Sequence, residues 1–531
     1  MAVATLAAAS GEDIIAFDMV RTKKSVFLAL ADARARNGGK RPIVVDGDDR
    51  ELTYDEIIRA TLALGHALKK GTKQRDAVGI MLPTSAAAVI AFLAVSAFNR
   101  VPAMINFTNG ATGVTSALRT AKVKRLVTAH KFIELAKLED LIKELESVVE
   151  IVYLEDVREH LSLTDKLTAG VGQFLPGLIA WRGAQDEVAV ILFTSGTEGA
   201  PKGVALSHAN LLANVEQMRA AVALYPNDAM FNPLPTFHCF GLTAGALMPL
   251  LLGLKCVYHP TPRQPHEIVR RIKAQGATIL VATDTFMSQY ARAGDQGDLN
   301  SLRLVFCGAE RVRDETRQLV KRKYSMEIIE GYGVTETSPV VSVNQPGDNR
   351  HGTVGRLLAG MQARLEPVEG IPHAGRLFLK GPNVMMGYIK PENPGVINPP
   401  PDGWHDTGDV VAIDEEGFIS IKGRMKRFAK VGGEVVSLAV VENCASAVWP
   451  DFAHAAVTFP DGRKGEQIVL VTTNPDAQRM ELVGWVHNHG VSDLAIPRRI
   501  IHVKEVPVMG TGKTDYVKVE RMVQAAPLPN N

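Results

Sequence analysis

The chain has 531 residues, of which 46% are hydrophobic and 22% are charged, as in ordinary globular proteins. At roughly 150 residues per domain, this length predicts two to four domains. The 59 Lys and Arg residues nearly balance the 57 Asp and Glu residues, and the net charge of +2 argues against a nucleic-acid partner and against a strongly acidic partner surface.

Cysteine usage and apolar runs indicate the compartment. The four cysteines are scattered without a CxxC pair, which favours a reducing compartment and no structural zinc. The first residues, MAVATLAAASGEDIIAF, lack the basic segment of a signal peptide. The longest apolar run, residues 86–98 with one serine inside it, is shorter than the roughly 20 residues that span a bilayer. We therefore expect a cytoplasmic protein, with weak peripheral membrane contact left open.

Strand-like and helical segments alternate through residue 340. The predicted strands are residues 77–82, 125–129, 277–283 and 303–310, and the predicted helices are residues 86–98, 131–145 and 313–324. Such alternation is typical of α/β layers with substantial parallel sheet. After it, residues 376–381 and 410–423 read as short antiparallel strands and hairpins, which predicts a small β-rich subdomain.

The last segment, of roughly 105 residues, mixes strands at 455–459 and 467–473 with helices and is long enough for a small α+β domain. The boundary is expected at GRMKRF, where a β-hairpin ends and a basic, Gly-flanked segment begins. The sequence thus predicts a large N-terminal α/β domain, residues 1–423, and a small C-terminal α+β domain, residues 424–531.

Residues 191–211, ILFTSGTEGAPKGVALSHANL, predict an anion-binding loop between a strand and a helix capped by Ser207. Glycines let backbone N–H groups converge on an anion, hydroxyls donate to it, and Lys202 adds positive charge. The alternative is a flexible surface turn. The loop is not a Walker A loop, because Pro201 stands where that pattern needs Gly. PVMGTGKT near the C-terminus comes closer to that pattern, but Pro507 replaces its first Gly.

Six motifs, in order, resemble the signatures of the adenylate-forming superfamily, which includes acyl-CoA synthetases, nonribosomal peptide adenylation domains and luciferases. They are TSGTEGAPKGVALSHANL (194–211), PLPTFHCFGL (233–242), GYGVTETSP (331–339), GWHDTGDVVAIDEEGF (403–418), GRMKRFAKVGGE (423–434) and GTGKTDY (510–516). The resemblance covers essentially the whole chain. It implies the adenylate-forming enzyme fold with a mobile C-terminal domain. The implied reaction is attack of a carboxylate on the α-phosphate of ATP, which gives an acyl-adenylate and pyrophosphate, followed by transfer of the acyl group to a thiol.

The resemblance also assigns the nucleotide contacts. The residues that would cradle the β- and γ-phosphates are Thr194, Ser195, Gly196, Thr197, Glu198, Gly199 and Lys202. Those that would close over adenine are Gly308, Ala309, Glu310, Gly331 and Tyr332, with Tyr332 stacking on the base. Asp409 would accept from both ribose hydroxyls, and Arg424 would add a second ribose contact.

Four residues resemble the family's reaction centre. Lys513 would reach the substrate carboxylate and the α-phosphate, where one long cation can neutralise both reacting anions. Glu336, with Thr197, would bind Mg²⁺, because a hard cation that bridges phosphates prefers oxygen ligands. Thr335 would contact the α-phosphate.

The same resemblance places His238 beside the acyl carboxylate and the thiol tunnel, although a lone histidine near an apolar run is often a packed core residue. Lys426 occupies the hinge position about which the small domain would rotate. Tyr516 departs from the family, which often has Arg three residues after the catalytic lysine, so the anchoring of that loop stays open.

Several strings look closest to one branch, the acyl-ACP synthetase half of the bacterial 2-acylglycerophosphoethanolamine acyltransferase/acyl-ACP synthetase. They are FHCFGLTAGALMPLL, GAER, GYGVTETSPVVSVNQPG, RFAKVGGEVVSLAVVE and GKTDY. This resemblance implies a fatty acid as substrate and the phosphopantetheine of acyl carrier protein as acceptor. The resemblance is to the synthetase half alone, so we do not expect this chain to acylate lysophospholipids.

The sequence does not decide between two acceptors. Basic clusters at 270–273, 321–324 and 424–427 would dock an acidic carrier protein, but coenzyme A is the alternative acceptor. The apolar stretch at 237–254 would line an acyl pocket or form a buried helix. The sequence is also compatible with an enzyme that stops at the adenylate and with a non-catalytic lipid or nucleotide sensor. The intact Lys202, Glu336, Asp409 and Lys513 argue against the sensor.

Overall fold

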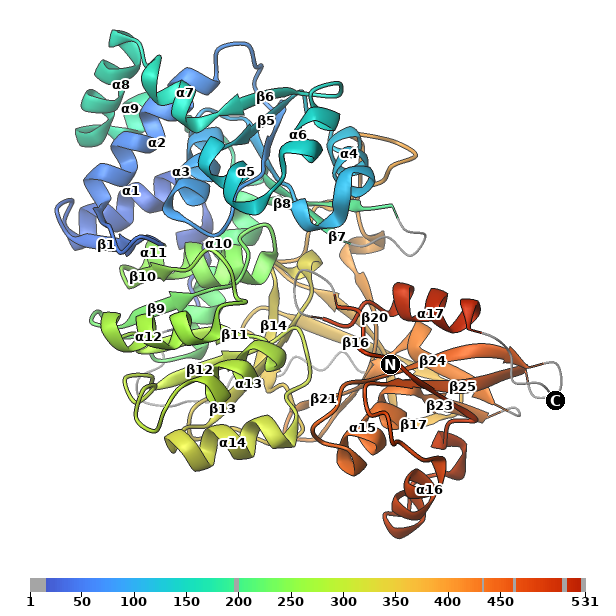
Figure 1. Cartoon of the computed structure of the whole chain (residues 1–531). Coiled ribbons are helices and arrows are strands. Elements are labelled where there is room, and N and C mark those ends of the chain that lie inside the picture. The colour runs from blue at the N-terminus through green and yellow to red at the C-terminus, as the bar shows by residue number, and fades with distance from the viewer. Residues whose placement is uncertain (1–15, 195–199, 432–433, 462–464, 509–512, 527–531) are drawn as a thin grey trace.

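The computed structural model describes residues 16–194, 200–431, 434–461, 465–508 and 513–526. Figure 1 shows two large sheets with their helices and, beside the yellow and orange strands, a C-terminal part in orange and red. The first large sheet has nine strands: β1 (Pro42–Val45), β2 (Glu51–Thr53), β9 (Ala229–Asn232), β10 (Lys255–Tyr258), β11 (Ile279–Ala282), β12 (Leu304–Cys307), β13 (Ile328–Gly333), β14 (Val340–Val343) and β15 (Arg356–Leu357).

The second large sheet has eight strands: β3 (Ala77–Ile80), β4 (Val101–Met104), β5 (Arg125–Thr128), β6 (Glu150–Tyr153), β7 (Val188–Thr194), β8 (Lys202–Ser207), β18 (Gly387–Ile389) and β19 (Ile397–Asn398). Its order is β19-β18-β8-β7-β4-β3-β5-β6, and that of the first is β15-β14-β13-β12-β11-β9-β10-β1-β2. Each sheet has a parallel centre, whereas β2, β14, β15, β8, β18 and β19 pair antiparallel. The expected fold class is confirmed, with mixed rather than wholly parallel sheets.

Helices cover and separate these sheets. They are α1 (Val26–Asn37), α2 (Tyr54–Leu68), α3 (Ala86–Ala97), α4 (Gly110–Thr120), α5 (His130–Ala136), α6 (Glu139–Leu145), α7 (Leu154–Glu159), α8 (Leu163–Phe174), α9 (Pro176–Ile179), α10 (His208–Ala221), α11 (Met248–Leu252), α12 (Pro265–Gln275), α13 (Asp284–Ala293) and α14 (Asp314–Tyr324). Helix α10 contacts strands of both large sheets and is therefore buried on nearly every side. No helix among the described residues is long and apolar enough to cross a membrane.

Short helical turns complete the N-terminal part. The 3₁₀ turns are η1 (Met19–Thr22), η2 (Phe107–Asn109), η4 (Thr335–Thr337), η5 (Pro401–Gly403), η6 (Met425–Arg427) and, further on, η7 (Asp493–Ala495). Element η3 (Phe240–Leu247) is a π-helix that continues directly into α11.

The β-rich region is a four-stranded antiparallel sheet of β16 (Gln362–Val368), β17 (Ile371–Lys380), β20 (His405–Ile413) and β21 (Ile419–Arg424). The C-terminal part has a five-stranded sheet of β22 (Phe428–Val431), β23 (Glu434–Ser437), β24 (His454–Asp461), β25 (Gly465–Thr472) and β26 (Arg499–His502). Its helices are α15 (Leu438–Val448), α16 (Arg479–Asn488) and α17 (Tyr516–Ala525).

Two hydrophobic clusters of the C-terminal part are distinct from the core of the N-terminal part. The large core runs from Val26 to Ile419, and the next cluster begins at Ala429. The domain boundary at residues 423 and 424 remains a prediction; it falls at the end of β21, between these cores.

Two sequence expectations were wrong. The anion loop does not lead from a strand into a helix, because residues 202–207 form β8, which pairs antiparallel with β7. The alternating small and apolar residues of KGVALS suit a buried strand, and α10 begins only after Ser207, whose hydroxyl caps it. The helix expected at 131–145 is broken into α5 and α6, because Lys137 adopts a left-handed conformation with φ of 54°.

Candidate functional site

The two segments expected to close over adenine lie side by side at the carboxyl ends of parallel strands. Gly308 to Glu310 follow β12, and Gly331 and Tyr332 lie in the neighbouring β13. A Cβ atom on Gly308 would lie 3.4 Å from the carbonyl oxygen of Gly331. Ligands of open α/β sheets bind at this edge of the strands.

Glu310 is half-buried and its carboxylate is held by hydrogen bonds. Its carboxylate accepts from the backbone N–H of Thr285 at 3.1 Å and from the Thr285 hydroxyl at 2.9 Å. Burial raises the pKa of Glu310 above its ordinary value, against these hydrogen bonds. The preceding residue, Ala309, has φ of 70°, a conformation that only glycine adopts easily and that often marks a functional site.

Asp409 is a buried carboxylate held by two donors. It lies in β20 directly opposite Arg424 in β21. The Tyr332 hydroxyl donates to Oδ2 at 2.5 Å, and Arg424 Nε donates to Oδ1 at 2.9 Å. The charge of Asp409 is the main cause that raises the pKa of Arg424. Since a carboxylate has about four lone-pair positions, Asp409 can still accept from two further hydroxyls.

Glu336 lies in η4 and is held by a tyrosine that the sequence reasoning missed. The Tyr388 hydroxyl donates to Glu336 Oε1 at 2.5 Å. Burial, and then the charge of Glu336, raise the pKa of Tyr388. Lys202 Nζ lies 5.8 Å from the centre of the Tyr388 ring, and the His405 ring packs edge-on at 6.2 Å. The available signal was the position of Tyr388 in GYIK, between the third and fourth motifs.

The structure describes the two residues that flank the predicted anion-binding loop. Thr194 ends β7 and lies directly opposite Lys202 at the start of β8. The loop residues expected to contact phosphate, Ser195, Gly196, Thr197, Glu198 and Gly199, lie outside the described residues. The pairing of β8 with β18 brings Lys202 to Tyr388 and so to Glu336.

The single carboxylate of Glu336 suits Mg²⁺ that binds together with the phosphates of a nucleotide. Within the described ranges, no group of three or more His, Cys, Asp or Glu side chains could hold a metal ion. Mg²⁺ retains waters and is usually bound by one or two carboxylates together with substrate phosphates. Glu336, which is 9% exposed, meets that requirement.

His238 stands between this site and an apolar cluster. It precedes the π-helix η3, and its buried Nε2 has no hydrogen-bond partner among the described residues. Burial, and then the charge of Lys513, lower the pKa of His238 to about 3, so the ring is neutral at physiological pH. A buried nitrogen without a hydrogen-bond partner is evidence for a ligand that supplies one. In addition, π-helical turns occur often at functional sites.

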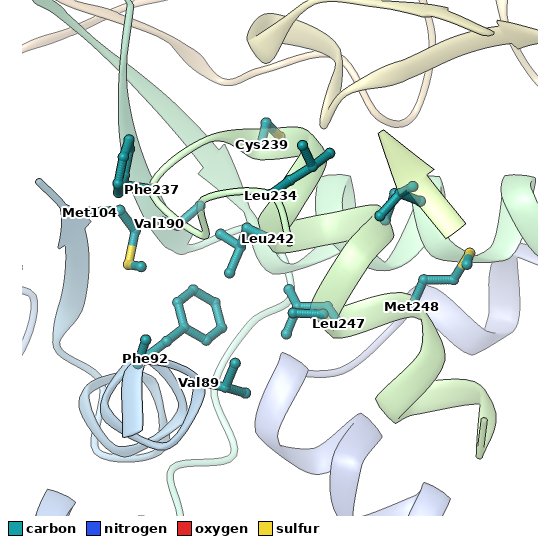
Figure 2. Packing of buried hydrophobic residues seen from close by; sticks show 14 of the residues in the cluster. Val89, Phe92, Met104, Val190, Leu234, Phe237, Cys239, Leu242, Leu247 and Met248 are labelled. Atoms are coloured by element: carbon teal, nitrogen blue, oxygen red, sulfur yellow. The ribbon is translucent and has the colours of Figure 1, made fainter. Parts of the chain in front are cut away.

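Figure 2 shows the apolar side chains around this segment. Phe237 and Leu242 face Phe92 of α3 and Met104 of β4, with Val89 further along the helix. Phe237 also packs edge-on against Phe107, with ring centroids 5.1 Å apart. The residues predicted to line an acyl pocket are therefore packed against helices and strands of the second large sheet.

Lys513 reaches the site from the C-terminal part. It stands just before a bridge between Val508 and Thr514 that closes the base of its loop. Burial, and then the charge of Arg424, lower the pKa of the Lys513 amine, whereas three acids raise it: Glu310, Asp409 and Glu336. The structure thus brings the lysine together with the acids and with His238, while Thr335 lies beside Glu336 in η4.

Tyr516 anchors the loop that carries Lys513. Its ring lies under the Arg427 guanidinium at 3.5 Å from the ring centre, and its hydroxyl donates to Glu442 at 3.2 Å. Arg427 also pairs with Glu442 at 2.7 Å. The Arg427 and Glu442 pair therefore connects the loop to η6, which contains the exposed Lys426.

The basic clusters carry less free charge than the sequence suggests. In cluster 270–273, Arg271 is buried and paired with Asp49, Arg270 pairs with Glu267, and Lys273 pairs with Asp298. In cluster 424–427, both arginines are paired, with Asp409 and Glu442. In cluster 321–324, the Lys323 amine donates to two backbone carbonyls.

Comparison with known proteins agrees with this geometry. The family model described as AMP-binding enzyme matches residues 31–389. The chain is 28% identical over 472 residues to the probable 4-coumarate–CoA ligase 3 of Dictyostelium discoideum, which covers 84% of this chain and 85% of that protein. It is 26% identical over 489 residues to the medium-chain fatty-acid–CoA ligase of Escherichia coli (strain K12), which covers 88% and 85%.

The solved structure of ATP-bound MatB from Rhodopseudomonas palustris shares the fold. Its TM-score is 0.81 at 24% identity, and the match covers 94% of this chain and 99% of that chain. The family match spans both large sheets and ends in β18, so it includes the loop after β7, the ends of β12 and β13, and Glu336. The chain therefore belongs to the AMP-binding enzyme family.

Proposed function

We propose that the chain is an AMP-forming acid–thiol ligase that activates a fatty acid with ATP and passes the acyl group to a pantetheine thiol. The observation that carries this proposal is the position of Lys513, which interacts with Glu336, Asp409 and His238 from the other part of the chain. The attack of a carboxylate on a phosphate requires a cation that neutralises both anions, close to acids that can bind the nucleotide.

Each side chain of the site is proposed to have a separate role in adenylation. Asp409 binds the ribose hydroxyls, and the hydrogen bonds from Tyr332 and Arg424 orient its carboxylate. Glu336 and Thr197 would hold Mg²⁺, which would neutralise phosphate charge and orient the pyrophosphate leaving group. Lys513 neutralises the attacking carboxylate and the α-phosphate, with Thr335 on the same phosphate.

His238 is proposed to orient the acyl carboxylate. Its Nε2 is buried, unsatisfied among the described residues and next to the apolar cluster of Phe237 and Leu242. A neutral imidazole donates one hydrogen bond to a carboxylate without leaving a buried positive charge. An apolar chain attached to that carboxylate would extend among the aliphatic and aromatic residues, which supports a fatty acid.

Two acceptors are supported by different observations. The curated relatives compared above are named CoA ligases, which supports coenzyme A. The strings that resemble the acyl-ACP synthetase branch support acyl carrier protein, but the basic clusters offered for its docking are largely paired within the chain. Coenzyme A is therefore the first acceptor to test, and carrier protein the second.

Thiol transfer is proposed to follow a rotation of residues 424–531. Lys426 lies in the short turn η6, between a sheet of the N-terminal part and the first strand of the C-terminal sheet. Rotation there would withdraw Lys513 and admit the thiol. The exposed side chain of Lys426 is free to follow such a change of backbone angles.

The test separates the two half-reactions. Lys513→Ala is expected to slow fatty-acid-dependent exchange of pyrophosphate into ATP by about 10²- to 10³-fold, the value of one transition-state contact. Given preformed acyl-adenylate and coenzyme A, the same variant should make thioester at the normal rate. Lys518→Ala, which removes an exposed lysine of α17, is the matched control. Equal loss in both half-reactions would contradict the proposed role.

A further inference from the structure

Helices α8 and α9 expose an apolar stripe that no other part of the described chain covers. Its six large side chains are Leu163, Leu167, Val171, Phe174, Leu175 and Leu178, and four of them are 67% to 79% exposed. Single exposed leucines are ordinary, but a contiguous apolar patch on one helix indicates an interaction site. In Figure 1, α8 and α9 form the upper left corner, far from the C-terminal strands.

The stripe is exposed because α8 is docked by its small residues. Ala169 and Gly172 are buried, and a Cβ atom on Gly172 would lie 2.2 Å from Cδ1 of Leu62 in α2. The large residues recur at spacings of four and three on the opposite face. A helix that only completed the core would place its leucines inward, so this arrangement serves another purpose.

An ionic cluster around the buried Asp165 fixes α8 in this orientation. The Asp165 carboxylate accepts from His66 Nδ1 at 2.5 Å and from Lys70 Nζ at 3.0 Å, both from the region of α2. Ser162 donates to the same carboxylate and closes a capping box. Burial raises the pKa of Asp165, but these hydrogen bonds outweigh it and keep the group ionised. The stripe is therefore held outward by specific contacts.

The exposed charges within the segment are positive. From residue 163 to residue 182, Lys166 and Arg182 are exposed, and the one acid, Asp165, is buried. The nearest exposed acids along the chain, Glu159 and Asp186, lie outside the segment. Such a surface complements an anionic one.

The composition of the stripe distinguishes between a lipid and a protein partner. Protein interfaces are enriched in Tyr, Trp, Phe, Met and Arg at their centres, whereas five of the six stripe residues are Leu or Val. An amphipathic helix with aliphatic and Phe residues on one face and basic residues beside it is typical of segments that lie in a bilayer interface. Trp181 is not part of the stripe, because it packs against His208.

We propose that α8 and α9 dock the protein on an anionic phospholipid surface, with the six apolar side chains entering the acyl boundary and with Lys166 and Arg182 at the headgroups. The proposal does not depend on the proposed reaction. It would place the protein where fatty acids partition.

The experiment is flotation of the full chain with vesicles of phosphatidylcholine, with and without phosphatidylserine. The protein should float with the anionic vesicles, and added salt should release part of it because charges are screened. The triple variant Leu167→Gln, Phe174→Gln, Leu178→Gln should lower the bound fraction by about tenfold. The matched control, Leu135→Gln with Met480→Gln, alters equally exposed apolar residues elsewhere and should bind normally.

Three results would overturn the proposal. The first is no flotation of the unaltered chain, and the second is equal flotation of the triple variant. The third is that the unaltered chain is a dimer in solution and the triple variant a monomer, because a second copy of the chain would then cover the stripe. Exchange of pyrophosphate into ATP with a short, soluble fatty acid should be unchanged in the triple variant. Because flotation needs no turnover, failure of the docking surface and failure of the proposed reaction are separate outcomes.

Discussion

At the scale of single residues, the acids of the site are not free carboxylates but are each held by a neighbour. Tyr388 fixes Glu336, Thr285 fixes Glu310, and Asp409 has two donors. A preorganised carboxylate binds a cation or a hydroxyl without first being reoriented, which is how such sites obtain electrostatic stabilisation in water-poor surroundings.

Glu336→Gln is expected to weaken productive binding of Mg²⁺ and ATP, because the amide keeps the shape but loses the charge that a hard cation requires. At limiting Mg²⁺, pyrophosphate exchange should fall by about 10²-fold, and excess Mg²⁺ should restore part of it. Glu327→Gln, at an exposed glutamate just before β13, is the control. Unaltered exchange at low Mg²⁺ would remove Glu336 from the metal site.

The acids and the lysine were predictable from motifs, but their partners were not. Glu336, Asp409 and Lys513 occupy recognisable strings, so their proximity was expected. Tyr388 reaches Glu336 only because β18 pairs with β8, a strand far away in the sequence. That pairing depends on tertiary packing, and no local pattern in the sequence specifies it.

At the scale of elements, the loop that carries Lys513 is positioned by the contact of Tyr516 with Arg427. The Tyr516 ring stacks under Arg427, and both side chains contact Glu442. Arg427 belongs to η6, so the same contact joins the lysine loop to the proposed hinge. Aromatic stacking of a guanidinium is worth about 0.5–2 kcal/mol, enough to bias the loop without locking it.

Tyr516→Ala should therefore slow adenylation by about tenfold, the effect of losing roughly 1.4 kcal/mol of positioning. Tyr516→Phe keeps the ring over which Arg427 lies, so its rate of adenylation should fall much less. Neither variant should slow thioester formation from preformed acyl-adenylate, since Lys513 is proposed to act only in adenylation. Tyr225→Ala, which removes a tyrosine stacked with Arg303 at 4.6 Å, is a matched control. Equal slowing of both steps would assign Tyr516 a purely structural role.

Element types were predictable for the apolar run of α3, for the amphipathic α14 and for the hairpin of β20 and β21. The errors arose where local geometry decided the outcome. The left-handed Lys137 divides one predicted helix, and the six residues of β8 follow glycines that indicated a loop. The π-helix η3 has no periodic signal at all, because its residues are buried on nearly every side.

At the scale of the whole molecule, the two large sheets are joined through buried polar contacts as well as through the shared core. Helix α10 lies between them, and His208 at its first turn accepts a hydrogen bond from the backbone N–H of Val26 at 3.2 Å. The ring is 3% exposed, and burial lowers its pKa to about 4. This histidine connects α10 to α1 only in its neutral form.

The buried hydrogen bond between Val26 and His208 predicts that the free energy of unfolding falls in mild acid. An unfolded histidine has a pKa of about 6.5, so between pH 6.5 and pH 4 the unfolded chain binds a proton that the folded chain excludes. The stabilisation is therefore fully present above pH 6.5 and is lost progressively as the pH falls toward 4. At pH 5.5, His208 alone should lower the free energy of unfolding by about 1.4 kcal/mol relative to pH 7.5.

The measurement is equilibrium urea denaturation at pH 7.5 and pH 5.5 for the unaltered chain and for His208→Gln. Glutamine does not titrate, and its amide oxygen can still accept from Val26. The variant need not be as stable at pH 7.5, but its loss of stability on acidification should be smaller by about 1.4 kcal/mol. Other buried histidines, such as His259 with a pKa of about 4, titrate equally in both proteins and cancel in the comparison. If both proteins lose the same stability, His208 is protonated or exposed in the folded chain, and α10 is not held to α1 in this way.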